Sequence, residues 1–342
     1  MSPSPQRSQG RRTMLAVLLF IAAFAAPPAR AADHIKVGTV SSLGSAPIFV
    51  AAAKGYFKDE GLDAELVPFE SAQPVAVAVT SGDIDFGSTG MTDAFFILAN
   101  QGALKLIGAG TWERKGFQGL GIIESNQAYD GGLKTFEGFT GHSAAVTQTG
   151  TPLHYNLGTI LAKHGVDFKT VRIVALQSNP NVASAIIGGQ VDGAMLSSAN
   201  IFALVNKGNA RLMGWLSDEL PAQQGDGTFT SAKIANSRPE TVKHFLAAFR
   251  RAEKTWDDAF LDANGNRVDQ PSAPEMIAIA AKGLNQPPEV IKLGLPYFDP
   301  ESRVSVSDIQ RALNWYEAQG LQKTHIDAQS LVDMRYATLM EK

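Results

Sequence analysis

The sequence contains a long internal repeat. Gly82-Asp83-Ile84-Asp85 recurs 107 residues later as Gly189-Gln190-Val191-Asp192. In the same order before each copy come a strand-like stretch, a loop of small residues, a helical stretch and a Gly-Leu/Val-Asp turn, and the offset stays between 104 and 107. Whole β-α-β-α-β units therefore repeat. Such a duplication predicts two similar lobes with a cleft between them.

The first 31 residues have the pattern of an export signal. Arg7, Arg11 and Arg12 form a basic start, Met14–Ala26 is apolar, and a small-x-small motif ends at Ala31. The apolar run is shorter than the ~20 residues that a membrane-spanning helix needs. We therefore expect residues 1–31 to be a signal peptide that is cleaved near Ala31 and directs the chain to the periplasm. The paired arginines also resemble a twin-arginine signal, so the general secretory and twin-arginine routes both stay open.

The composition excludes several kinds of chemistry. The chain has no cysteine, which rules out disulfides, thiolate nucleophiles, cysteine metal sites and the acceptor of a bacterial lipid anchor. Its six histidines show no metal-ligand spacing, and no run of like charges suggests a nucleic-acid partner. We expect a soluble chain that needs no metal and no cofactor.

The order of predicted elements indicates an α/β fold. Strands alternate with helices of roughly ten residues, which is typical of a mostly parallel, helix-covered sheet in each lobe. The helices expected after residue 236 have no counterpart in the repeat, and we infer that they pack on the first lobe. The first lobe then comprises residues 33–115 and 236–342, the second comprises residues 116–235, and the chain crosses the hinge twice.

Four loops are the candidate ligand site, because ligands bind outside the carboxyl ends of parallel strands. Hydroxyl groups and exposed helix N-termini in these loops suit the oxygens of an anion. The alternative for any one loop is that its residues only cap helices and permit turns. Matching loops on both sides of a cleft favour a ligand. The candidate residues are Ser41, Ser42, Leu43, Gly44, Ser45, Ser88, Thr89, Gly90, Thr147, Thr149, Gly150, Thr151, Ser197, Ser198 and Asn200.

Three further residues are candidates for ligand contact. Trp112 lies near the first lobe crossing, where its ring could stack on a ligand or simply cover the hinge. Arg114 is the nearest counter-charge for an anion, although loop charges are usually solvated. His154, in the first turn of the helix after Thr151, could reach the cleft or lie on the surface.

The repeated aspartates, Asp85 and Asp192, suggest at first a catalytic pair. Each lies near the start of a strand, however, at the end opposite the ligand loops, so hydrogen bonding in a turn explains both better. The Gly87–Gly90 segment has the wrong spacing for a nucleophile elbow. These patterns predict that the protein is not an enzyme.

Five blocks together resemble one family. They are Ala46–Ala51, Lys54–Asp63, Ser81–Gly87, Gly189–Ala194 and Pro239–Leu246. In combination they are similar to periplasmic solute-binding proteins of the sulfonate/taurine/nitrate ABC importers, a family that includes thiamine-pyrimidine binders. The resemblance runs from about residue 35 to about residue 336.

The resemblance implies a two-lobed periplasmic-binding-protein fold of type II, with two hinge strands, that closes around a small solute. It also implies an inner-membrane ABC permease and ATPase as partners, a monomeric state, and a ligand site made of the four loops and the region of Trp112. Many sulfonate-type relatives have an aromatic or proline-containing stretch where this chain has Leu196–Asn200. That difference leaves the identity of the ligand open.

The sequence thus favours a binding protein for a small organic anion, a sulfonate or a carboxylate, aromatic ones included. Two alternatives stay open: an enzyme on the same scaffold, such as a pyrimidine synthase, and a receptor coupled to a sensor. The Cys-rich motif of the pyrimidine-synthase branch is absent, which argues against the first alternative.

Overall fold

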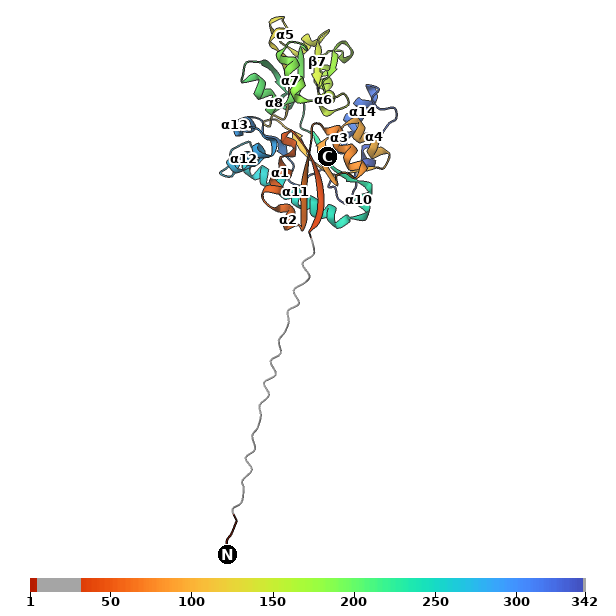
Figure 1. The fold of residues 1–342 in the computed structure, drawn as a ribbon. Coiled ribbons are helices and arrows are strands. Elements are labelled where there is room, and N and C mark those ends of the chain that lie inside the picture. The colour runs from red at the N-terminus through yellow and green to blue at the C-terminus, as the bar shows by residue number, and fades with distance from the viewer. Residues whose placement is uncertain (5–31, 341–342) are drawn as a thin grey trace. The chain divides into compact units, whose positions relative to one another are not determined.

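The computed structural model describes residues 1–4 and 32–340. The predicted export signal, residues 1–31, therefore falls almost entirely outside the described residues. Residues 32–340 contain two five-stranded sheets and a small three-stranded sheet, with helices packed around them (Figure 1). Within the described ranges, no helix combines the length and the apolar character that crossing a bilayer requires.

The first sheet has the strand order β2-β1-β3-β12-β4. β1 runs parallel to β2 and β3, whereas β12 is antiparallel to β3 and β4. The strands are β1 (Asp33–Val40), β2 (Leu62–Phe69), β3 (Phe86–Gly90), β4 (Leu104–Ala109) and β12 (Asp226–Ser231). The helices that precede the second sheet in the chain are η1 (Leu43–Ser45), α1 (Ala46–Ala53), α2 (Tyr56–Asp59), α3 (Ala72–Ser81) and α4 (Asp93–Asn100).

The second sheet repeats this design in the order β8-β7-β9-β6-β10. β7 runs parallel to β8 and β9, and β6 is antiparallel to β9 and β10. The strands are β6 (Leu120–Ser125), β7 (Ser143–Val146), β8 (Arg172–Ala175), β9 (Gly193–Ser197) and β10 (Ala210–Trp215). The helices are α5 (Asn126–Asp130), η2 (Phe136–Phe139), α6 (Pro152–Lys163), η3 (Phe168–Thr170), α7 (Asn179–Ile187), α8 (Ser198–Val205) and α9 (Leu216–Glu219).

The chain crosses between the two sheets twice, as expected. The crossings carry β5 (Thr111–Glu113) and β11 (Gln223–Gln224), which pair antiparallel, and β13 (Tyr297–Phe298) adds to β5 from the other side. In each sheet the antiparallel fourth strand, β12 or β6, is the first long strand after a crossing. The two-lobed α/β fold with two hinge crossings is therefore confirmed.

One boundary differs from the expectation. Residues 226–235 were expected in the second lobe, but β12 lies inside the first sheet, where Phe229 pairs with Gly87 of β3 and Leu106 of β4. The second lobe therefore ends before Asp226. A short strand with buried residues on both faces does not reveal from sequence which of two sheets it joins.

The C-terminal helices, which are drawn from cyan to blue in Figure 1, cover the first sheet. The longest, α11, buries Phe245, Phe249 and Trp256 in the same core as β1, and α14 buries Leu313 and Tyr316 in the core on the other face. These helices therefore share their cores with strands of the first sheet. They are α10 (Ala232–Ser237), α11 (Pro239–Phe260), α12 (Ala273–Leu284), α13 (Pro288–Leu293), α14 (Val306–Ala318) and α15 (Ala328–Leu331).

The glycine of each repeated motif follows α3 or α7. Gly82 and Gly189 have φ values of 86° and 65°, in the left-handed region that glycine adopts at low cost. Gly82 is the C-cap of α3, whereas Gly189 lies one residue beyond the C-cap of α7. The repeated glycine therefore marks the turn from helix into the next strand.

The aspartate of each motif ties two parallel strands together. Asp85 Oδ2 accepts a hydrogen bond of 2.7 Å from the backbone N–H of Lys36, and Asp192 Oδ2 accepts one of 2.7 Å from the backbone N–H of Ser143. The donor precedes its aspartate by 49 residues in both lobes. These contacts support the structural interpretation of both carboxylates and account for their recurrence.

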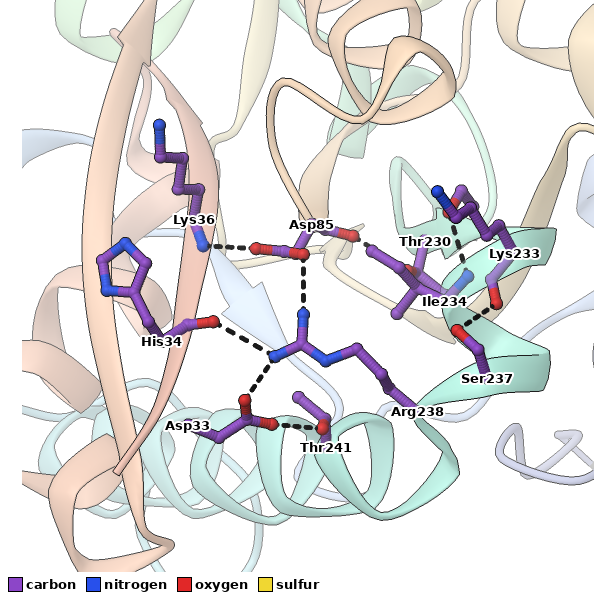
Figure 2. A network of polar contacts seen from close by, with 11 residues as sticks. Asp33, His34, Lys36, Asp85, Thr230, Lys233, Ile234, Ser237, Arg238 and Thr241 are labelled. Carbon is purple, nitrogen blue, oxygen red and sulfur yellow. Dashed lines mark hydrogen bonds and ion pairs between the residues drawn. The ribbon is translucent and has the colours of Figure 1, made fainter. Parts of the chain in front are cut away.

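In the first lobe this aspartate also anchors the start of α11 (Figure 2). Arg238 donates to Asp85 Oδ1 at 3.0 Å, to Asp33 Oδ1 at 2.6 Å and to the carbonyl oxygen of His34 at 3.1 Å. Thr241 of α11 donates to the second oxygen of Asp33. The network lies at the amino ends of the strands, opposite the ligand loops.

Candidate functional site

Two adjoining cavities lie between the lobes, at the carboxyl ends of the parallel strands. Their volumes are about 140 Å³ and about 90 Å³, and residues of both lobes line each one. Ser42 and Asp226 come from the first lobe, Pro152 and Ser197 come from the second, and all four border both cavities. The site therefore lies where parallel sheets are expected to bind ligands.

Eleven of the eighteen candidate residues line these cavities. They come from the ends of β1, β3, β7 and β9 and from β5 in the hinge. They are Ser41, Ser42, Leu43, Gly44, Thr89, Gly90, Trp112, Thr147, Thr151, Ser197 and Ser198.

The hydroxyl groups of these residues are not equally available to a ligand. Thr151 donates to the carbonyl oxygen of Gln148 at 2.8 Å and accepts from the N–H of His154, so its oxygen caps α6. By contrast, the hydroxyls of Ser42, Thr89 and Thr147 make no hydrogen bond to any residue that the structure describes. These three groups are free to bind a solute.

Three candidates serve the framework. The Ser45 hydroxyl bonds to both the N–H and the carbonyl oxygen of Val40, at 3.0 and 3.1 Å, which fixes the loop after β1. Ser88 is buried and shares a 3.0 Å hydrogen bond with Thr228 of β12. Asn200 donates to the Ser197 hydroxyl at 2.8 Å, so it orients a cavity residue without lining the cavity itself.

His154 belongs to an aromatic contact between the lobes. Its ring packs against Trp315 of α14 and Phe168, with ring centroids 5.0 and 5.5 Å apart. Burial lowers its pKa to about 4, so the imidazole is neutral, and its Nδ1 accepts a 3.2 Å hydrogen bond from the N–H of Gly150. Gly150 also borders neither cavity, and Thr149 is exposed.

Arg114 points away from the cavities. Its guanidinium donates to the carbonyl oxygen of Gly265 at 3.2 Å and lies over the ring of Tyr297, 4.8 Å from the centroid. The cation that the sequence suggested as a counter-charge is therefore held against the C-terminal part of the first lobe. No lysine, arginine or histidine is among the described residues that line either cavity.

The hinge adds two carboxyl groups. Asp226 lines both cavities and Glu113 lines the second. Burial is the main reason that the pKa of Glu113 is raised to about 8, and the nearby charge of Asp226 contributes to this rise. Burial also raises the pKa of Asp226 to about 6, against the lowering effect of a hydrogen bond from the Thr111 hydroxyl. At neutral pH Glu113 is therefore protonated, and Asp226 is the carboxylate.

Trp112 combines the two roles that the sequence left open. It pairs with Gln224 of β11 and Tyr297 of β13, so it covers the hinge, and its side chain also lines the second cavity. The residue is 7 % exposed, and its indole N–H has no acceptor among the described residues. Stacking of its ring on a ligand stays a prediction.

Residues 43–260 match the family model described as NMT1/THI5 like. The chain belongs to this family. A protein of Brucella abortus (strain 2308), whose name assigns it only a binding role, is 28 % identical over 254 residues, which is 71 % of this chain and 73 % of that protein.

Solved structures share the fold of this family member. The alkanesulfonate-binding protein SsuA of Xanthomonas axonopodis pv. citri bound to MOPS has a TM-score of 0.72 and 20 % identity, over 90 % of this chain and 99 % of that one. The periplasmic nitrate-binding protein NrtA of Synechocystis PCC 6803 has a TM-score of 0.68 and 18 % identity, over 88 % and 85 %. The similarity confirms the periplasmic-binding-protein fold.

Several residues that line the cavities of this family member were not predicted from the sequence. Ala72 and Asn179 start α3 and α7, and both border the first cavity. They are 107 residues apart, so the repeat itself was the signal that could have found them. Asp226 lies in a Gly-Asp-Gly sequence whose polar composition predicted a linker. The other residues missed are Val40, Glu70, Ser71, Thr111, Glu113, Gly119, Leu120, Pro152, Leu153, Ala199, Gly225, Gly294 and Pro296.

Proposed function

We propose that this chain is the substrate-binding component of an ABC importer and captures a small organic solute between its two lobes. The observation that carries the proposal is a cavity with hydroxyl-bearing residues in its walls, shared by two duplicated lobes at the carboxyl ends of their strands. Membership of the NMT1/THI5-like family and the fold shared with SsuA and NrtA support it.

Lobe closure is the proposed binding mechanism. The structure has direct contacts across the cleft: Asp93 of the first lobe donates its N–H to the carbonyl oxygen of Gly150 at 2.7 Å, and Ser198 of the second donates to the carbonyl oxygen of Gly294 at 3.1 Å. A solute that touches both lobes stabilises this closed arrangement by its differential affinity for it. The closed form then docks on the permease, whose ATPase drives import.

The hydroxyl groups suit a solute with an anionic group. Ser42, Thr89 and Thr147 offer O–H donors from both lobes to the oxygens of a sulfonate or carboxylate. SsuA and NrtA are named for sulfonate and nitrate, which agrees with this chemistry.

We also propose that the protein is a non-catalytic monomer that is exported to the periplasm. The residue pattern of the first 31 positions and the periplasmic location in the name of NrtA support export. The binding role in the names of its relatives supports a receptor over an enzyme. A receptor releases its solute unchanged when the complex is denatured, whereas an enzyme on this scaffold releases product.

A melting-temperature screen tests the proposal. Sulfonates, carboxylates and pyrimidines are added singly to the mature chain, and unfolding is followed by scanning fluorimetry. A compound at about 100 times its Kd adds about 2.7 kcal/mol to the free energy of unfolding, which raises Tm by several degrees. Absence of a shift with every member of the panel would contradict the proposed function.

A further inference from the structure

We propose that the solute carries a protonated nitrogen, which the closed protein places against Asp226 and beside Trp112. This inference rests on the proposed binding function and names the chemistry of one end of the solute. The opposite end is the one that the hydroxyl groups of Ser42, Thr89 and Thr147 contact.

The walls of the two cavities carry acidic side chains and no basic ones among the described residues. The charged or titratable side chains that line the two cavities within residues 32–340 are all acidic: Asp226, Glu113 and Glu70. Glu70 is exposed at the rim of the first cavity. A carboxylate that keeps its charge in a partly dehydrated site stabilises a cationic group more strongly than it would in water. It repels a purely anionic solute for the same reason.

The Asp226 carboxylate lies close to Gly44 and Gly90. A Cβ atom at Gly44 would lie 2.4 Å from Asp226 Oδ2, and a Cβ atom at Gly90 would lie 3.6 Å from Oδ1. The two glycines therefore let the loops after β1 and β3 approach this carboxylate closely. Its protein partner is the Thr111 hydroxyl. A carboxylate has about four lone-pair positions, so acceptor capacity is left for a ligand donor.

The Glu113 carboxyl lies against the backbone of the hinge turn. A Cβ atom at Gly119 would lie 2.2 Å from Glu113 Oε1, and Oε2 accepts a long hydrogen bond of 3.4 Å from the N–H of Leu120. This carboxyl is therefore enclosed by the hinge turn, where its charge is disfavoured. Asp226 is left as the anionic group deep in the cavity.

Trp112 supplies an independent observation at the same place. It lines the second cavity with Asp226, it is 93 % buried, and its indole N–H lacks an acceptor among the described residues. Indole faces attract organic cations, and the attraction grows when both partners are shielded from water. An aromatic ring and a carboxylate that line the same cavity favour a protonated amine or amidine over a neutral isostere.

The test compares matched probes that differ in one nitrogen. The pairs are 3-aminopropane-1-sulfonate with propane-1-sulfonate, and benzamidine with benzamide, each titrated calorimetrically into the mature chain. The variant is Asp226→Asn, which keeps the shape and removes the charge. The control is Asp130→Asn, which makes the same charge change on α5, outside both cavities. Circular dichroism establishes that both variants are folded.

We expect the charged-nitrogen member of at least one pair to bind wild type at least about tenfold more tightly than its partner. Asp226→Asn should abolish that ratio, and Asp130→Asn should retain it. Equal or tighter binding of the member without a protonated nitrogen in both pairs overturns the inference, as does a ratio that survives Asp226→Asn. In those cases a compound still binds, so the proposed function stands. Failure of all four probes and of the wider melting screen contradicts both proposals.

A pH series replaces the variant if Asp226→Asn does not fold. Benzamidine stays protonated between pH 8 and pH 5, whereas Asp226 takes up a proton near pH 6. Glu113 is already protonated below pH 8, and Glu70 is the remaining carboxyl in the first cavity. The preference for benzamidine over benzamide should therefore decline below pH 6. A preference that stays constant from pH 8 to pH 5 overturns the inference.

Discussion

Gly158→Leu is expected to weaken solute binding by roughly 5- to 150-fold while leaving both lobes folded. Gly158 lies in α6 of the second lobe, and a Cβ atom there would lie 2.5 Å from Cζ2 of Trp315, in α14 of the first lobe. The indole is wedged against His154 and Tyr155, with ring centroids 5.0 and 5.7 Å away. It therefore has little room to move in the closed arrangement.

The added side chain penalises only the state in which the lobes touch. Overpacking costs about 1–3 kcal/mol, which corresponds to the stated loss of affinity. Ala162→Leu is the control, because it adds the same side chain at an exposed position of α6. The double variant Gly158→Leu/Trp315→Ala should regain affinity, since it restores the space. Calorimetric titration with the compound that raises Tm most measures all four Kd values, and an unchanged Kd for Gly158→Leu would show that this contact is not part of the binding state.

Stability is expected to fall as pH rises from about 4 to about 8, because two buried carboxyl groups of α11 keep their protons in the folded state. Glu253 is fully buried and Asp257 is 5 % exposed. Ser302 donates to one oxygen of Glu253, while Glu253 Oε1 and Asp257 Oδ2 have no partner among the described residues. Burial raises the pKa of Glu253 well above its usual value and raises that of Asp257 to about 8.

The folded chain keeps two protons that the unfolded chain loses above about pH 4. Between the ordinary carboxyl pKa near 4 and the folded values, the folded chain binds more protons than the unfolded chain, so a rise in pH favours unfolding. Each carboxyl contributes a loss of about 1.4 kcal/mol per pH unit across that window. The contribution of Asp257 is complete by about pH 8.

Neutral substitutions isolate this effect. Glu253→Gln and Asp257→Asn should each reduce the difference in unfolding free energy between pH 5 and pH 8 by several kcal/mol, measured by urea denaturation. Asp258→Asn is the matched control, because this neighbouring carboxylate is exposed and pairs with Lys254. If the two buried substitutions leave the pH dependence of wild type unchanged, the folded protein does not hold these protons.

The duplicated lobes and the location of the cleft could be predicted because both follow from local patterns. The glycine and the aspartate of the repeated motif each perform a local task, at a helix end and between parallel strands. Loops after such strands meet at one edge of a sheet. For that reason the sequence correctly predicted four cavity residues in the Ser41–Ser45 loop and two in the Thr147–Thr151 loop.

The charge of the site could not be predicted, because it depends on contacts between distant segments. Arg114 is drawn to Gly265 and Tyr297 in the C-terminal part of the chain. Asp226 reaches the cavity because the return crossing inserts β12 between β3 and β4. No local pattern in the Gly-Asp-Gly segment indicates this insertion.

A distance measured between the lobes, with and without solute, tests whether the solute closes them. The chain has no cysteine, so Lys169→Cys and Lys323→Cys place one spin label on each lobe at exposed positions. Pulsed electron resonance then gives the distance distribution with and without the compound that raises Tm most. A saturating concentration should shorten and narrow the distribution, and Gly158→Leu should block this change. An identical distribution with and without bound compound would show that the solute does not close the lobes.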